Sequence, residues 1–127
     1  MDKVVHFEIP YDDEERAKKF YSGVFNWQIV PIPAMHYNIV RTAKTDEDGM
    51  IQEPGAINGG LFKRTDGAST VIVINVDNVE EKIKEVVKAG GRVVTQPTKV
   101  GDMGLYAKVE DTEGNIIGIW ENLPKGK

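Results

Sequence analysis

The sequence predicts an α+β protein made of two copies of a strand–helix–three-strand (βαβββ) unit. Three observations support this prediction. Short β-rich segments alternate between apolar and polar residues, two amphipathic helix patterns each follow a strand, and one offset of 65 positions relates the two halves. At 127 residues the chain is long enough for one domain with a substantial hydrophobic core.

The first half is predicted to contain one strand, one helix and three further strands. Residues 4–11 are β-rich and alternate in polarity, which favours a strand. Asp12 then offers a cap for a helix, with Glu15 as its capping-box partner three positions on. The apolar stripe of this helix recurs at helical spacing as Ala17, Phe20, Tyr21 and Val24. Three strands are expected next, over residues 27–32, 37–43 and 55–63.

The second half repeats this order. Residues 70–76 predict a strand, and Asp77 is expected to cap a second helix with Glu80 as its partner. Gly90 fits the position just after the end of that helix. The helix stripe consists of Val79, Ile83, Val86 and Val87. Three strands follow over residues 92–95, 105–110 and 116–121.

The repeat has a single offset. It relates the expected caps Asp12 and Asp77, and it also relates the acidic turns that begin at Asp46 and Asp111, each pair being 65 positions apart. Solenoid repeats have shorter periods of about 20–50 residues, so this period indicates a duplicated supersecondary unit. We expect a single domain over residues 1–127, with modules at about 1–65 and 66–127.

Composition excludes several classes of protein and site. The chain has no cysteine, which removes disulfides, thiolate nucleophiles and cysteine-bound zinc. Acids outnumber bases by 20 to 16 and no basic patch is present, which argues against nucleic acid or an anionic membrane as partner. No signal peptide is evident, and no apolar stretch approaches the roughly 20 residues that span a bilayer. We therefore expect a cytoplasmic protein.

Six short motifs occur in a characteristic order over nearly the whole chain. They are VHFEI at 5–9, ERAKKFY at 15–21, VFNW at 24–27, VDN at 76–78, AGG at 89–91 and EDTEGN at 110–115. In this order the chain resembles the vicinal oxygen chelate superfamily, which includes lactoylglutathione lyases (glyoxalase I), bleomycin-resistance proteins, extradiol dioxygenases and epimerases. It is most similar to the subgroup related to lactoylglutathione lyase. The resemblance implies a curved, half-open mixed sheet with one helix behind each half, a cavity in front, and a homodimer.

The resemblance also implies four metal-ligand positions, two in each module. They fall on His6, on Gly59 or Gly60, on Val71 and on Gly118. Of these residues only His6 carries a donor atom, whereas a catalytic divalent metal needs about three protein ligands. Glu8 is the one nearby substitute on the same strand face as His6. We expect no metal and no other cofactor, although a divalent metal held by unusual ligands stays open.

Strand alternation predicts which side chains face the cavity and which face the helices. The expected ligand-binding residues are His6, Glu8, Gly60, Phe62, Val73, Gly118 and Trp120. The expected helix-facing residues are Val5, Phe7, Ile9, Ile72, Ile74, Ile117 and Ile119. His6 and Glu8 are the candidate catalytic residues, and the two glycines are expected to leave space for a ligand. Trp120 could stack on a planar or cationic ligand, fill the pocket, or lie in a dimer interface.

Three functions are compatible with these residues, because a fold does not determine a function. The first is a metal-independent protein that binds a small organic molecule. The second is a metal-dependent, glyoxalase-like lyase or isomerase with non-standard ligands. The third is a dimeric interaction module with a vestigial cavity. Whether the protein is an enzyme stays open; if it is one, the resemblance implies a lyase, isomerase or dioxygenase.

Overall fold

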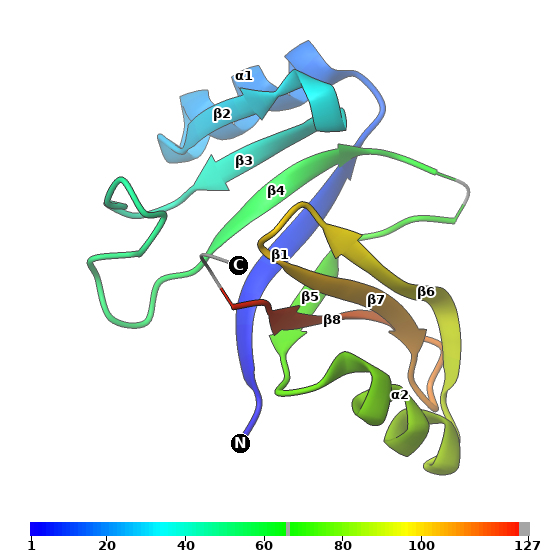
Figure 1. Cartoon of the computed structure of the whole chain (residues 1–127). Helices are drawn as coiled ribbons and strands as arrows, with labels where there is room; N and C mark the ends of the chain where they lie inside the picture. Colours follow the sequence, from blue (N-terminus) through cyan, green and yellow to red (C-terminus); the bar gives the residue numbers. More distant parts are fainter. Residues whose placement is uncertain (66, 125–127) are drawn as a thin grey trace. The chain divides into compact units, whose positions relative to one another are not determined.

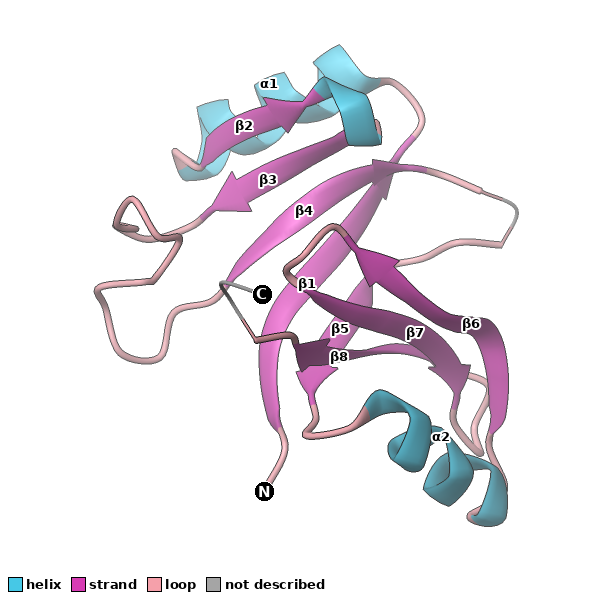
Figure 2. Ribbon diagram, viewed as in Figure 1, coloured by secondary structure: helices cyan, strands magenta, loops and turns pink. Residues whose placement is uncertain are grey.

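The computed structural model describes residues 1–65 and 67–124 (Figure 1). The chain divides into two compact units, one over His6–Thr70 and one that joins Met1–Val5 to Val71–Lys127. We call them the first and the second unit. The order strand–helix–three strands occurs twice along the chain (Figure 2), which confirms the predicted α+β class and the predicted duplication.

The first unit contains a mixed four-stranded sheet and one long helix. Its strands lie in the order β2-β3-β4-β1, with β4 parallel to β1 and the other neighbours antiparallel. The elements are β1 (Lys3–Tyr11), α1 (Glu14–Phe25), β2 (Gln28–Ile32), the 3-10 helix η1 (Pro33–Met35), β3 (Tyr37–Arg41) and β4 (Asn58–Lys63). The division between the units falls within β1, and residues 6–11 of that strand pair with β4.

The core of the first unit lies between its sheet and α1. Its buried members are Tyr11, Val40 and Leu61, packed against by Phe7, Ile9, Ala17, Tyr21, Trp27 and Ile29. Tyr21 of α1 and Trp27 stack with their ring centroids 5.1 Å apart and their planes within 6°. Trp27 is therefore an aromatic residue of the core.

The second unit repeats this plan. Its elements are β5 (Val71–Asn75), α2 (Val79–Lys88), β6 (Arg92–Val100), β7 (Gly104–Glu110) and β8 (Ile116–Asn122). The strands lie in the order β5-β8-β7-β6, with β5 parallel to β8. The core consists of Val76, Val79, Ala107, Val109 and Ile119, together with Ile74, Ile83, Val86, Leu105 and Ile117.

Most of the residues predicted to face the helices do so. Five of them join the two cores, namely Phe7, Ile9, Ile74, Ile117 and Ile119. The prediction was wrong for Val5 and Ile72, which are 40% and 42% exposed. Each lies two positions before a core residue of the same strand, Phe7 or Ile74, so it is on the same face of the sheet. The first helix-packed residue of each strand is therefore one alternation later than predicted.

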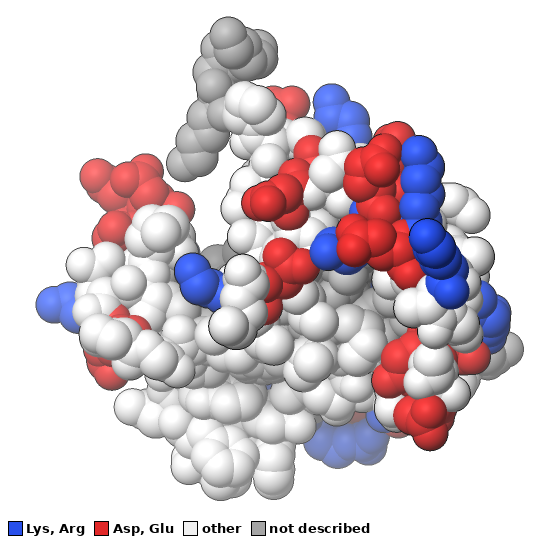
Figure 3. All heavy atoms as spheres, turned by 90° about the horizontal axis from the view of Figure 1, so that it is seen from below, with Lys and Arg blue, Asp and Glu red and all other residues white. Residues whose placement is uncertain are grey.

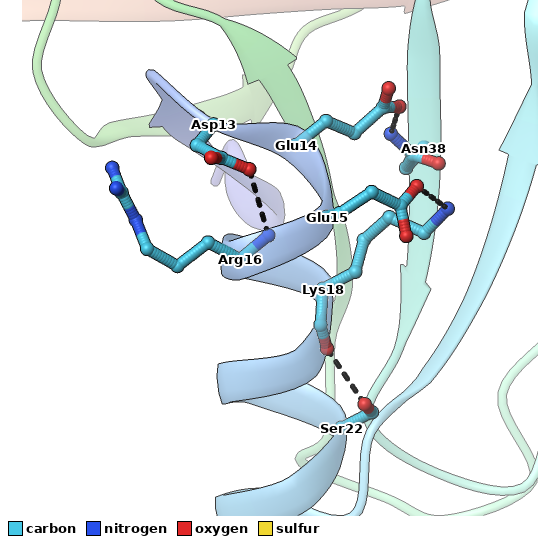
Figure 4. A network of polar contacts seen from close by, with 7 residues as sticks. All are labelled: Asp13, Glu14, Glu15, Arg16, Lys18, Ser22 and Asn38. Carbon is cyan, nitrogen blue, oxygen red and sulfur yellow. Dashed lines mark hydrogen bonds and ion pairs between the residues drawn. The ribbon is translucent and has the colours of Figure 1, made fainter.

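Both helix caps lie one position later than predicted. Asp13 accepts a hydrogen bond from the amide of Arg16 at 3.0 Å (Figure 4), and Asn78 accepts one from the amide three positions on at 2.9 Å. The capping side chain belongs to the last residue with extended backbone, and that residue is not the predicted Asp12 or Asp77. Because the error is the same in both halves, the offset of 65 persists.

The two acidic turns show the duplication in their hydrogen bonds. Oδ1 of Asp46 and Oδ1 of Asp111 each accept the amides two and four positions on, at 2.8–2.9 Å. Each turn then passes through a glycine with positive φ, +81° at Gly49 and +84° at Gly114. A side chain would strain the backbone there, so the same residue types produce the same turn twice.

Strands β2 and β6 each show an effect of the tertiary structure. β2 includes Pro31, because the strand lies at the edge of the sheet, where a missing amide proton is tolerated. β6 continues to Val100, five residues beyond the prediction, and pairs with β7 through register shifts on both sides of Thr95. Tertiary pairing with β7 therefore extends a segment whose own residues predicted a shorter strand.

Charges of both signs are mixed on the surface. On the face seen from below, acidic and basic side chains lie next to one another (Figure 3). On α2, for example, Lys84 lies 3.2 Å from Glu81 and Lys82 lies 3.3 Å from Glu85. No helix within residues 1–65 and 67–124 is long and apolar enough to cross a membrane.

The cap assignment can be tested with two neighbouring substitutions. Asn78→Ala removes the side chain that binds the α2 amide and is expected to lower the free energy of unfolding by about 1 kcal/mol. Asp77→Ala is the matched control, because it leaves that hydrogen bond in place and is expected to cost less than half as much. Urea denaturation of both variants measures the difference. A larger loss in Asp77→Ala would contradict the assignment.

Candidate functional site

The structure joins the two candidate polar residues of β1 through a tyrosine of β3. Nε2 of His6 lies 2.8 Å from the hydroxyl oxygen of Tyr37. The same hydroxyl donates a hydrogen bond to Oε2 of Glu8 at 3.1 Å. All three residues belong to the first unit, and we call them the His6–Tyr37–Glu8 network.

Gly60 makes this network possible. β4 lies between β3 and β1, and within it Gly60 is paired with Glu8 on one side and with Ile39 on the other. A Cβ atom added to Gly60 would overlap the hydroxyl and ring of Tyr37. Because Gly60 has no side chain, Tyr37 can lie across β4 and reach the two residues of β1.

Burial and charge control the protonation of the network. Burial lowers the pKa of His6 below its ordinary value of 6.5, against the smaller, opposing effect of the Glu8 charge. Burial, the Glu8 charge and the hydrogen bond to Glu8 together raise the pKa of Tyr37 far above its ordinary value. At neutral pH the network therefore holds a neutral imidazole and a protonated phenol.

The second unit carries the same arrangement of tyrosine and glycine. A Cβ atom on Gly118 of β8 would lie 2.7 Å from the hydroxyl oxygen of Tyr106 of β7. In both units the tyrosine is paired with an aromatic residue two positions after the glycine, Phe62 for Tyr37 and Trp120 for Tyr106. Each glycine thus makes room for a tyrosine of the adjacent strand, where the sequence suggested open space for a ligand.

The structure divides the seven predicted ligand-binding residues between the units. In the first unit His6, Glu8 and Gly60 come together around Tyr37, and Phe62 is paired opposite Tyr37. In the second unit the predicted residues are Val73, Gly118 and Trp120. Val73 is paired with Gly118 on β8, and Trp120 lies near Tyr106 with their ring centroids 6.4 Å apart.

Sequence reasoning missed both tyrosines. Tyr37 is 31 positions from His6 and reaches it across an intervening strand, so no spacing along the chain reveals the contact. A usable signal exists, however. An aromatic side chain commonly covers a glycine on a neighbouring strand. The expected order of a tyrosine-containing strand followed by a glycine-containing strand could therefore have predicted the contact.

The residues at the expected metal positions do not fit a divalent metal. Glycine and valine offer no donor atoms, and Tyr37 and Tyr106 cover Gly60 and Gly118. Within the described part of the chain, no group of three or more His, Cys, Asp or Glu residues is placed to hold a metal ion. His6 instead uses one ring nitrogen in a hydrogen bond to Tyr37.

A shallow depression of about 320 Å³ lies elsewhere in the first unit, beside the start of α1. Its wall includes Tyr11, Arg16, Phe20, Tyr21 and Arg64, and none of the three network residues. Arg64 is engaged with Asp12 at 3.0 Å and with the carbonyl of Ala68 at 2.7 Å. This depression is therefore distinct from the site that the sequence predicted.

A buried polar contact ties the start of α1 to β3. Asn38 is fully buried and donates a hydrogen bond from Nδ2 to Oε2 of Glu14 at 2.6 Å (Figure 4). Its Oδ1 atom has no hydrogen-bond partner within the described residues. The contact holds the capped end of α1 against the sheet that carries Tyr37, so it supports the site indirectly.

Comparisons with known sequences agree with this architecture. A sequence model of the Glyoxalase/Bleomycin resistance protein/Dioxygenase superfamily matches residues 3–119. A glyoxylase-like domain-containing protein of Didymella fabae is 32% identical over an alignment of 123 positions, and the match covers 88% of this chain and 88% of that protein. The CFP32 proteins of Mycobacterium bovis and Mycobacterium tuberculosis, whose names assign them provisionally to the glyoxylases, are 26% identical over 111 residues. Those residues are 86% of this chain but 41% of either mycobacterial protein.

Solved structures share the fold at low identity. A hypothetical protein of Bacillus halodurans C-125 superposes with a TM-score of 0.66 at 16% identity, covering 99% of this chain and 98% of its own. Methylmalonyl-CoA epimerase of Mycobacterium tuberculosis superposes with a TM-score of 0.63 at 14% identity, covering 96% and 89%. At such low identities the similarity establishes the fold alone and does not show what chemistry the site performs.

The role of Gly60 can be tested by adding one methyl group. Gly60→Ala forces Tyr37 away and is expected to lower the free energy of unfolding by about 1–3 kcal/mol. Gly23→Ala is the control, because nothing lies within 4 Å of its added Cβ and alanine favours the helix. It is expected to stabilise the protein by roughly 0.5–1 kcal/mol. Chemical denaturation would contradict this account if Gly60→Ala were neutral.

The burial of His6 predicts a loss of stability in acid. The pKa of His6 is lower in the folded state than in the unfolded chain. The unfolding free energy that depends on the neutral imidazole is therefore fully present above about pH 6.5 and is lost as the pH falls through the folded pKa. Thermal unfolding followed from about pH 8 to about pH 5 should show this decline in the wild type and in His36→Gln, and a shallower one in His6→Gln. Equal declines in all three proteins would refute the prediction.

Proposed function

Because the chain belongs to the Glyoxalase/Bleomycin resistance protein/Dioxygenase superfamily, we propose that it binds a small organic molecule without a resident metal. One observation carries this proposal. At the position where a metal ligand was expected, His6 takes part in the His6–Tyr37–Glu8 network. Small-molecule sites orient their ligand with a few converging polar groups, and these three half-buried side chains form such a group.

The chemistry of the side chains supports binding through hydrogen bonds. Gly60 and Gly118, at two of the expected ligand positions, provide no donor atom and lie beneath tyrosine rings. A metal-dependent reaction needs a cation to polarise the substrate oxygens, and the residues at these positions cannot hold one. A hydrogen-bonding site for a small molecule needs only the polar network and the aromatic residues beside it.

The alternative of a glyoxalase-like lyase or isomerase rests on the relatives. Three of the proteins compared above carry glyoxylase names, and the epimerase shares the fold. For this alternative to hold, a divalent metal would have to bind through ligands other than those at the four expected positions. The metal content of the purified protein and its behaviour with a chelator separate this alternative from the proposal.

The third function, a dimeric interaction module, is favoured by one surface. On α1 the side chains of Phe20, Val24 and Phe25 are 53%, 61% and 54% exposed, and Phe20 contacts Phe25 edge-on at 6.1 Å between centroids. Exposed apolar clusters of this kind often mark protein contacts. We keep the homodimer as part of the proposal, with small-molecule binding as the function.

A thermal-shift screen in EDTA tests the proposed function. Planar neutral and cationic compounds are expected to raise the melting temperature of the wild type by several degrees at ten times their Kd, equivalent to about 1.4 kcal/mol. The shift should be unchanged by EDTA, reduced in Tyr37→Phe, and reduced in Trp120→Ala if the ligand stacks on that ring.

Each other outcome of the screen has a definite meaning. Shifts that require added zinc, nickel or manganese, and that EDTA abolishes, would support the metal-dependent alternative. The absence of any stabilising compound would support the interaction module. Hits that persist unchanged in both Tyr37→Phe and Trp120→Ala would show that the ligand binds at another place.

A further inference from the structure

We infer that Tyr37 holds His6 in the Nε2–H form, so that Nδ1 is the hydrogen-bond acceptor of the site and selects ligands that carry an O–H or N–H donor. The inference deepens the proposed function and rests on it for the identity of the site. It makes Tyr37 a positioning residue, which acts on the ligand through His6.

The hydroxyl hydrogen of Tyr37 points at Glu8. The hydroxyl has one hydrogen and lies between Oε2 of Glu8 at 3.1 Å and Nε2 of His6 at 2.8 Å. A carboxylate can only accept hydrogen bonds, so the hydrogen of Tyr37 must point at Glu8. If it pointed at His6, the carboxylate would face the lone pairs of the hydroxyl oxygen at hydrogen-bond distance, which is repulsive.

The direction of the Tyr37 hydroxyl determines which nitrogen of His6 carries a hydrogen. Because the hydrogen of Tyr37 is used toward Glu8, the hydroxyl oxygen is an acceptor toward Nε2. Nε2 must therefore carry a hydrogen. Burial keeps the imidazole neutral at neutral pH, and a neutral imidazole has one N–H and one bare nitrogen. The bare nitrogen is Nδ1.

Nδ1 of His6 is accessible to a ligand. Within the described residues no side chain or backbone group makes a hydrogen bond to this atom. Nδ1 is also not one of the fully buried side-chain atoms that have no hydrogen-bond partner. A fully enclosed nitrogen without a partner would be among those buried atoms, so Nδ1 of the half-buried His6 keeps contact with solvent and can meet a ligand. A basic, bare nitrogen accepts an O–H or N–H from the ligand and gives no such bond to an ether or ester oxygen.

The tautomer can be read directly by NMR. In the full chain labelled with ¹⁵N-histidine, long-range ¹H–¹⁵N spectra at neutral pH show which ring nitrogen is protonated. The chain has two histidines, so His36→Gln assigns the signals of His6. We expect Nε2 to appear protonated and Nδ1 to appear unprotonated, with the Nε2–H protected from rapid exchange by its bond to Tyr37.

Two variants separate this role from a merely structural one. In Glu8→Ala the hydroxyl of Tyr37 is free to donate to Nε2, so the ratio of Nδ1–H to Nε2–H is expected to rise roughly tenfold. In Tyr37→Phe the protection of the Nε2–H is expected to disappear. Backbone ¹H–¹⁵N spectra report whether each variant is folded, and Tyr37→Phe, the milder change, decides the matter if Glu8→Ala fails to fold.

Ligand selection is tested with phenol and anisole, which share a ring and differ in the O–H donor. Phenol is expected to move the Nδ1 resonance of the wild type along a saturable curve, and anisole is not. Equal responses, or no saturable response to phenol, would overturn the inference, as would an Nδ1–H tautomer in the free wild type. The tautomer spectra need no ligand, so a failed compound screen with an intact Nε2–H overturns the proposed function separately.

Discussion

The candidate site depends on one close approach, that of the Tyr37 ring to the backbone of Gly60. A single methyl group at Gly60 would occupy the position of the Tyr37 hydroxyl. Without that approach, β4 would separate β3 from β1, and His6 and Glu8 would lose the group that bridges them. The approach requires Gly60 at this position, because any other residue would place a Cβ atom there.

The polar groups of this site are held by hydrogen bonds to one another and not by coordination to a metal ion. A metal centre would use several charged or imidazole ligands around a cation, whereas here one imidazole bonds to a phenol that bonds to a carboxylate. Burial keeps the imidazole and the phenol of this arrangement uncharged, since it disfavours both the imidazolium and the phenolate. The proposed binding of a small molecule without a metal and the proposed tautomer of His6 both follow from the same hydrogen bonds.

The duplication shows how the two units diverged. The pairing of Glu8 with Gly60 recurs as the pairing of Val73 with Gly118, and the offset of 65 also relates His6 to Val71. Both units therefore keep the glycine and the covering tyrosine. The first unit places polar residues beside that tyrosine, whereas the second places two buried valines at the equivalent strand positions. The scaffold repeats, and the polar network belongs to the first unit.

The sequence by itself determined the eight strands, the two helices, the duplicated turns and most of the helix-facing residues. Those features depend on the periodicity and turn chemistry of residues close in the chain. It placed both caps one residue early, because two adjacent residues could cap each helix and the second is the one whose side chain accepts the helix amide. Only the tertiary structure decided that Tyr37 covers Gly60 and bridges His6 and Glu8. That contact spans 31 positions and crosses a strand, and it depends on a register that no local pattern records.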